Sequence, residues 1–403
     1  MTWATYGLVG YFAYFETVLG PLMPFLRAEQ DLSYTVASLH FSAFASGGVL
    51  VGLSGERFEA RWGRAVALWG GATGMAIGAL LLTVAPSPAG TVLGAFVMGF
   101  FGSMLLITTQ AVLSDRHGTK SVVAITESNV AASACAIMAS LAVGFFAASG
   151  LGWRSALVPP VVGLVLLVAT FRREPMEAEA DKGSGRTTIP SRLPGRFWVF
   201  WGVLALGVSV EWCIAYWGAD FLENGVGMGR SAAAAALTAF FGAMLAGRIA
   251  ASRLARSVPG AILLTASLGL ALAGFPLLWL APTPLVGIIG LSTTGLGVGS
   301  VYPLGVSVAV LSAPGRLETA TARLALGAAG AILVAPFVLG ALADVAGISG
   351  AFGVVLPLLL IALGLTLAGR RSCHAAASYA RAASWAVSYV PRPRRVLAVR
   401  ISA

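Results

Sequence analysis

Long apolar stretches recur along the whole chain, and each is about as long as a helix needs to cross a bilayer. An α-helix needs roughly 20 residues to span ~30 Å of hydrocarbon. Charged residues make up only 10% of the 403 residues, whereas ordinary soluble domains have roughly 25%. Strands are excluded because the stretches do not alternate and open strands cannot satisfy their backbone in lipid. The sequence therefore predicts an all-α, polytopic membrane protein.

We predict twelve transmembrane helices in two pseudo-symmetric six-helix bundles. Short charged or Pro/Gly-rich segments separate the spans, and two pairs of spans are divided only by proline-containing turns, Pro86–Ser87–Pro88 and Pro282–Thr283–Pro284. Such turns are typical of tight hairpins. The predicted spans cover residues 4–26, 34–54, 65–85, 89–113, 122–148, 153–171, 196–222, 231–252, 259–281, 285–312, 319–343 and 350–369.

Lys and Arg are distributed very unequally over the predicted loops. With a cytoplasmic N-terminus, all of the 26 basic residues except Arg27, Arg154 and Arg230 fall in cytoplasmic loops or the tail. This assignment places Arg248 in a cytoplasmic loop. Cytoplasmic loops are enriched in Lys and Arg. We therefore expect a multi-pass protein of the cell (inner) membrane with both termini cytoplasmic. The net charge of +10 then faces anionic lipid and requires no nucleic acid.

The longest polar stretch lies midway along the chain and predicts the domain organisation. Residues 172–195 are charged and contain Gly, Ser and Pro, which suits a cytoplasmic linker between an N-terminal bundle (1–171) and a C-terminal bundle (196–369). Residues 370–403 form a basic cytoplasmic tail. The tail could lie as a helix on the membrane surface or be a disordered basic segment.

The segment after the second span carries a motif. Gly52, Glu56 and Arg57 are followed, after a four-residue insertion, by Gly63 and Arg64. This pattern resembles the loop signature of the major facilitator superfamily, and a related DRHGTK segment with Asp115 and Arg116 follows the fourth span. The resemblance implies a carrier that works by alternating access, with these residues at a cytoplasmic gate. Glu127 and Asn129, near the cytoplasmic end of the fifth span, are expected at the same gate.

Subfamily features point weakly to one branch of that superfamily. The fifth span lacks the Gly-Pro motif of drug/proton antiporters, and the fourth span lacks the arginine of many proton-coupled members. Glu211 with Trp217, followed by FFGAMLAGR (Phe240–Arg248), is similar to the fucose/glucose-type permeases. This similarity implies a sugar-like substrate.

Two carboxylates lie inside predicted spans, where an ionised group costs at least ~2.5–3.5 kcal/mol near the bilayer centre. Glu211 has aromatic neighbours, which suit the apolar face of a polar solute, and Glu16 lies in the first span. We expect Glu211, with Glu16 as second choice, to bind substrate or a coupling proton, because desolvation favours protonation of a carboxylate. The alternative is a structural hydrogen bond to a neighbouring helix. The remaining candidate contacts are Trp212, Tyr216, Trp217, Tyr302, His40 and Gln110.

Several function classes compete with transport. An intramembrane enzyme would need a catalytic constellation, and the sequence has no HExxH or GxSxG, so we expect no enzyme. A channel or a non-transporting sensor is the third hypothesis. Three scattered cysteines do not form a metal site or a disulfide framework, and we expect no cofactor. The predicted protein is a monomeric secondary transporter in a lipid bilayer, whose partners are a small-molecule substrate and protons. A symporter of a small polar solute is favoured, and an efflux carrier or uniporter is the alternative.

Overall fold

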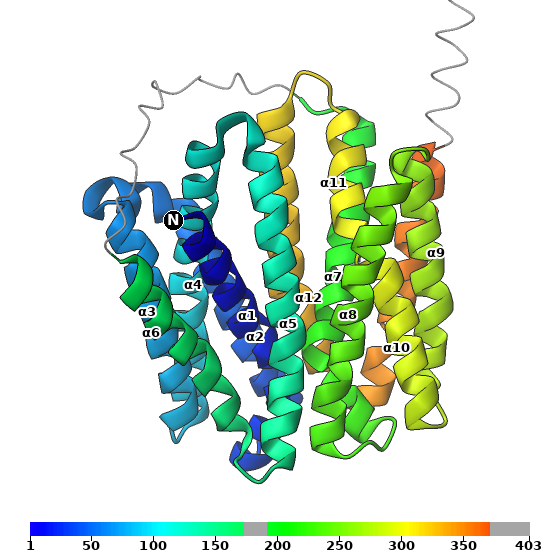
Figure 1. Cartoon of the computed structure of the whole chain (residues 1–403). Coiled ribbons are helices and arrows are strands. Elements are labelled where there is room, and N and C mark those ends of the chain that lie inside the picture. Colours follow the sequence, from blue (N-terminus) through cyan, green and yellow to red (C-terminus); the bar gives the residue numbers. More distant parts are fainter. Residues whose placement is uncertain (173–191, 371–403) are drawn as a thin grey trace, which may run out of the picture.

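The computed structural model describes residues 1–172 and 192–370, and for residues 55–60 and 122 it describes the backbone alone. Within these ranges the chain is helical throughout and has no strand (Figure 1). The first half contains α1 (Thr2–Gln30), α2 (Tyr34–Trp62), α3 (Arg64–Val84), α4 (Pro88–His117), η1 (Gly118–Lys120), α5 (Ser121–Ala148), η2 (Trp153–Leu157) and α6 (Val158–Phe171). The second half contains α7 (Gly195–Asn224), α8 (Arg230–Leu254), α9 (Gly260–Trp279), α10 (Pro284–Val298), α11 (Val301–Leu311), α12 (Leu317–Phe352) and a terminal helix, Val355–Arg370.

The helices confirm the predicted fold class. Ten helical segments of the described residues are long and apolar enough to cross a membrane. The 29-residue α1 and the shorter apolar helix Val355–Arg370 complete the twelve spans. Most of the predicted linker and nearly all of the predicted tail lie outside the described residues. The linker and the tail therefore remain predictions.

The tenth span is broken into two helices, α10 and α11. Pro303 has no N–H to donate to the carbonyl of residue 299 four positions earlier, and a proline ring crowds that carbonyl. The helix accordingly stops at Val298 and resumes at Val301. The eleventh and twelfth spans are divided at Gly347, whose φ of 71° lies in the region that glycine adopts readily.

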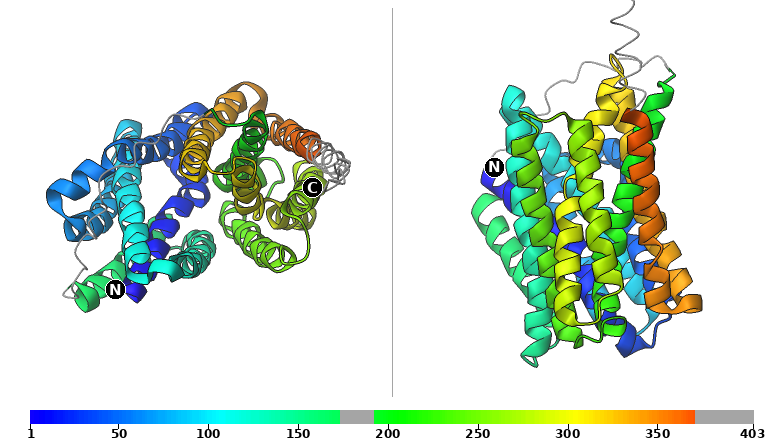
Figure 2. Two further views of the ribbon diagram at one scale, coloured as in Figure 1. Left: turned by 90° about the horizontal axis from the view of Figure 1, so that it is seen from above. Right: turned by 90° about the vertical axis from the view of Figure 1, so that its right-hand side faces the viewer.

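The two halves lie side by side, and three helix pairs make most of the contact between them: α1 with α7, α2 with α12, and α5 with α8 (Figure 2). The N-terminus, the end of α6 and the start of α7 share one face of the molecule, at the top of Figure 1. We call it the linker face, and we call the opposite face, which carries the α1–α2, α5–α6 and α7–α8 connections, the far face.

Each of the three pairs has a glycine at its closest approach. A Cβ at Gly20 would run into the backbone carbonyl of Ala215 in α7, one at Gly144 would strike the backbone of α8, and one at Gly340 would strike α2. Small residues let membrane helices approach backbone to backbone. All three glycines lie on the far-face side of their helices, so the halves are packed tightly there.

A pair of glycines in α8 provides a stability test of this packing. A Cβ at Gly247 would press against the carbonyl of Leu296 in α10, whereas one at Gly242 would meet nothing within 4 Å. We expect Gly247→Ala to destabilise the protein by ~1–3 kcal/mol through overpacking. Gly242→Ala should stabilise it by roughly 0.5–1 kcal/mol, because alanine is the better helix former. Thermal unfolding of the two purified variants measures the difference, and equal melting temperatures would contradict the packing described for α8.

Candidate functional site

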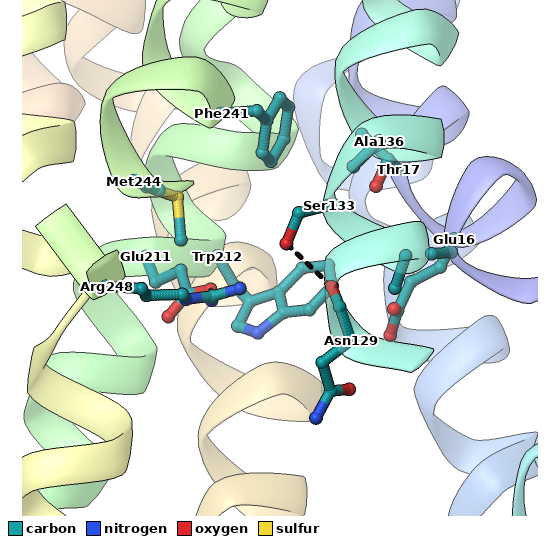
Figure 3. Close-up of a pocket in the computed structure, with 12 residues that line it drawn as sticks. Glu16, Thr17, Asn129, Ser133, Ala136, Glu211, Trp212, Phe241, Met244 and Arg248 are labelled. Carbon is teal, nitrogen blue, oxygen red and sulfur yellow. Dashed lines mark hydrogen bonds and ion pairs between the residues drawn. The ribbon is translucent and has the colours of Figure 1, made fainter. Parts of the chain in front are cut away.

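A cavity of about 180 Å³ lies between the two halves (Figure 3). Helices α1 and α5 form one wall and α7 and α8 form the other, so each half contributes two helices. Three of the lining residues are ionisable, and the others are small, polar, aromatic or, for Met244, aliphatic. The cavity is lined by Ala13, Glu16, Thr17, Asn129, Ala132, Ser133, Ala136, Glu211, Trp212, Phe241, Met244 and Arg248.

The cavity lies midway through the helices and is closed toward the far face. Glu16 and Glu211 are near the middle of α1 and α7, two helices that both run from the linker face to the far face. The contact of Gly20 with Ala215 comes one turn beyond these carboxylates in the direction of the far face. On the linker side Asn129 is exposed, so the cavity opens toward the linker face.

Glu211 forms an ion pair with Arg248 across the α7–α8 wall. The Arg248 Nη2 lies 3.4 Å from the Glu211 Oε1. The Nε of the same guanidinium donates a 2.9 Å hydrogen bond to the carbonyl of Gly299, the carbonyl that Pro303 leaves without a helical donor. Assigning Arg248 to a loop is therefore wrong, because it lies inside α8 and lines the cavity.

Glu16 faces the pair from the opposite half and has no such partner. Within residues 1–172 and 192–370, no hydrogen bond or ion pair holds its half-buried carboxylate. The fully buried Tyr216 interacts with it electrostatically, and the Tyr216 hydroxyl has no hydrogen-bond partner among the described residues. The Tyr216 ring stacks on Phe41 at 4.1 Å and lies 4.8 Å from the ring of Trp212. An aromatic cluster thus supports the region around Glu16.

The structure brings together only some of the predicted substrate contacts. Glu16, Glu211 and Trp212 line the cavity, and Asn129, which we expected at the gate, lines it too. Trp217 is fully buried and donates its Nε1–H to the carbonyl of Pro336 at 2.8 Å.

Three further candidates lie outside the cavity wall. His40 is fully buried, and its Nε2 lies 2.9 Å from the Thr91 hydroxyl oxygen, so this nitrogen has a structural partner. Tyr302 in α11 is near enough to Glu211 to interact electrostatically. Gln110 is exposed on α4. None of these three is among the residues that line the cavity.

Apart from Asn129, the predicted gate residues lie toward the linker face. Arg64 Nη1 and Asp115 Oδ2 form a 2.7 Å ion pair between the start of α3 and the end of α4. Gly63, which precedes α3, has a φ of 82°. Glu127 accepts a 2.6 Å hydrogen bond from the Tyr6 hydroxyl of α1. Gly52 lies in α2 and Arg116 in α4, and the side chains of Glu56 and Arg57 are outside the described set.

Each of the three arginines at the far face forms an ion pair. Arg154 pairs with Glu29 at 2.8 Å, and Arg230 pairs with Glu223 at 2.8 Å. The Arg154–Glu29 pair is exposed, whereas Glu223 is half-buried, and each pair lies within one half. Glu29 and Glu223 thus offset two of the three arginines that the Lys/Arg distribution leaves on that side.

The third pair joins the halves. The Arg27 Nη1 of α1 lies 2.8 Å from each carboxylate oxygen of Asp220 in α7, and the Asp220 side chain is 0% exposed. Asn224 donates a further 2.8 Å hydrogen bond to Asp220, and the Arg27 guanidinium lies 3.5 Å from the centre of the Tyr34 ring. On the same side, the Asp344 carboxylate accepts hydrogen bonds from the backbone N–H groups of Tyr34 and Thr35.

Sequence reasoning missed two features of this arrangement. Arg248 lies within the predicted span 231–252. The criterion that singled out Glu16 and Glu211, a charged residue inside a span, therefore applies to Arg248 as well. The Arg27–Asp220 pair had no such indication, because the two residues are 193 positions apart and each could have been an interfacial residue.

Two helical halves with a polar cavity midway across the membrane form the architecture of a secondary transporter. The sequence from residue 5 to residue 317 matches the model of the Major Facilitator Superfamily. The chain belongs to this superfamily. A search of curated proteins found no match.

Solved transporter structures share the fold. A bacterial homologue of the human lysosomal transporter Spinster, inward-facing and occupied, is similar with a TM-score of 0.72 and 15% identity, over 92% of this chain and 96% of that one. The nucleoside transporter NupG, in a mutant form, gives 0.72 and 14% over 91% and 98%. The peptide transporter POT in complex with sulfate gives 0.69 and 14% over 92% and 95%. At these identities the likeness concerns the fold.

Proposed function

We propose that this transporter moves a small polar solute across the cell membrane together with protons. The observation that carries the proposal is the Glu211–Arg248 ion pair in a cavity between the halves. A charged pair midway through a membrane protein is expensive unless it has a function. Family membership supports alternating access, and the tight far-face packing with a cavity open to the linker face supports an inward-open state.

The ion pair offers a means of coupling. A proton on Glu211 would remove its negative charge and weaken its hold on Arg248, so the guanidinium becomes available to a solute. Return of the carboxylate to Arg248 would then accompany release of the proton. Glu16 is the second candidate for the proton, because its carboxylate lies in the same cavity on the other half.

The substrate class rests on the cavity. A sugar-like solute fits the resemblance to fucose/glucose-type permeases, but Trp217, one of the residues behind that resemblance, lies outside the cavity wall. An efflux carrier or a uniporter would use the same cavity, with the opposite direction or without the proton. We keep these as the alternatives that the transport experiment separates.

Proteoliposomes test the proposal. Purified protein is reconstituted, and uptake of labelled sugars, amines and other small polar metabolites is followed with and without an acidic exterior. We expect at least one solute to accumulate above its external concentration only when the pH gradient is imposed. Accumulation that requires the reversed gradient would indicate efflux, and equilibration indifferent to the gradient would indicate a uniporter.

The proposed location in the cell membrane, with the linker face in the cytoplasm, has its own test. Cys135, Cys213 and Cys373 are first replaced, and single cysteines are placed at Ser184 or Ser402. We expect neither to react with an impermeant thiol reagent added outside whole cells, because the Lys/Arg bias places both sites in the cytoplasm. Both should react after permeabilisation, and labelling of either from outside would reverse the orientation.

A further inference from the structure

The charges that line the cavity do not balance. Arg248 offsets Glu211 at 3.4 Å, which leaves Glu16 as the one ionisable lining residue without an opposite charge among the described residues. The Tyr216 hydroxyl, which interacts with Glu16 electrostatically, cannot supply a positive charge. With Glu16 and Glu211 both ionised, the cavity therefore carries one net negative charge. A buried charge without a partner is costly, so a cation entering the cavity is stabilised there.

The groups around Glu16 suit an organic cation. Trp212 contributes an aromatic ring to the cavity, and aromatic rings attract cations through their faces. Thr17 and Asn129 add oxygen acceptors to the cavity wall, and an ammonium group has three hydrogens to donate. Phe241 and Met244 form an apolar part of the wall, which would accommodate a hydrocarbon portion.

We propose that the transported solute carries a protonated amine, and that Glu16 binds its ammonium group. The inference rests on the proposed transport function and narrows its substrate class. The cavity of about 180 Å³ is smaller than the ~300–1,000 Å³ of sites for drug-sized ligands, so the amine is of small-metabolite size. A neutral sugar would leave Glu16 without an opposite charge, and an anion would be repelled by it.

Binding to the purified protein tests the proposal independently of transport. Three probes with one aromatic skeleton differ in charge: phenethylamine is a cation, phenethyl alcohol is neutral and hydrocinnamate is an anion. Binding is followed by intrinsic tryptophan fluorescence, with D-glucose as a further neutral probe. We expect phenethylamine to bind roughly tenfold or more tightly than the alcohol, since hydrogen bonds to charged groups are the stronger ones, and the anion to bind most weakly.

Variants assign the preference to Glu16. Glu16→Gln should reduce the amine-over-alcohol ratio to near one, and Glu16→Asp should retain most of it because the charge remains. Glu29→Gln, which removes a carboxylate at the far face outside the cavity, should leave the ratio unchanged. Melting temperatures of the variants verify that they are folded, and Glu16→Asp keeps the test decisive if Glu16→Gln does not fold.

Three outcomes would overturn the inference. Equal binding of amine and alcohol, tightest binding of hydrocinnamate or glucose, or an amine preference that survives in Glu16→Gln each contradicts it. Absence of binding by all three aromatic probes at millimolar concentration also contradicts it. Failure of proton coupling is a separate result, because it would appear as amine uptake that ignores the pH gradient while the binding preference persists.

Discussion

The Glu211→Gln variant is expected to lose accumulation of solute and to keep exchange. Glutamine resembles the protonated carboxyl in shape and charge, so the variant stays permanently in the proton-loaded form. Solute present on both sides should still exchange across the membrane at a rate near that of the wild type. Uptake against a gradient should fall to the equilibration level, because no proton is released to drive the cycle. Both rates are measured in proteoliposomes with and without an acidic exterior.

A carboxylate outside the cavity provides the matched control. Glu29→Gln removes the carboxylate that pairs with Arg154 at the far face and should leave proton-driven accumulation largely intact. If Glu211→Gln accumulates solute as well as the wild type does, the coupling group is not Glu211. The same measurement on Glu16→Gln then decides whether the second candidate carries the proton.

The Arg27→Ala variant is expected to lose roughly 3–5 kcal/mol of stability, the effect of removing one partner of a buried ion pair. The Asp220 side chain is 0% exposed, and without Arg27 the partners that remain, Asn224 and Tyr34, carry no positive charge. The far-face junction of α1 with α7 should loosen accordingly. Thermal unfolding in detergent measures the loss of stability. A cysteine introduced near Asp220 should also react faster with a thiol reagent added outside, which measures the loosening of the junction.

Arg154→Ala serves as the control because its pair with Glu29 has the same 2.8 Å separation but side chains that are 46% and 41% exposed. Exposed pairs contribute ~0–1 kcal/mol, so little change is expected. Replacing both members of the inner pair, Arg27→Met with Asp220→Leu, should recover much of the stability lost by Arg27→Ala. Equal effects of Arg27→Ala and Arg154→Ala would show that burial of Asp220 does not govern the far-face junction.

Hydropathy was sufficient to predict the twelve spans, because crossing a bilayer requires a minimum number of apolar residues in each helix. It also located Glu16 and Glu211, since a charge inside such a stretch stands out against its neighbours. The break in the tenth span follows from Pro303 and the missing donor to Gly299. These features depend on residues that are close together in the sequence.

Hydropathy and local sequence could not predict which side chains pair with one another. His40, Trp217 and Glu211 are all polar-capable residues within spans, yet only Glu211 faces the cavity, because the rotation of each helix is set by packing against its neighbours. Asp220 and Arg27 belong to different halves, and nothing local indicates that they meet. The prediction for Arg248 failed for a different reason. Because most basic residues lie in cytoplasmic loops, Arg248 was assigned to a loop although it lies within a span.

The hydrogen bond from Arg248 to Gly299 has a consequence for the mobility of the site. Since Pro303 can never donate to that carbonyl, one edge of the guanidinium is tethered to the backbone at the helix break, whatever happens at its other edge. The two terminal nitrogens of the guanidinium can exchange one carboxylate partner for another while the Nε hydrogen bond holds the group in place. A lysine at this position would supply the charge, but its single ammonium could not keep the hydrogen bond to the Gly299 carbonyl and exchange carboxylate partners at the same time.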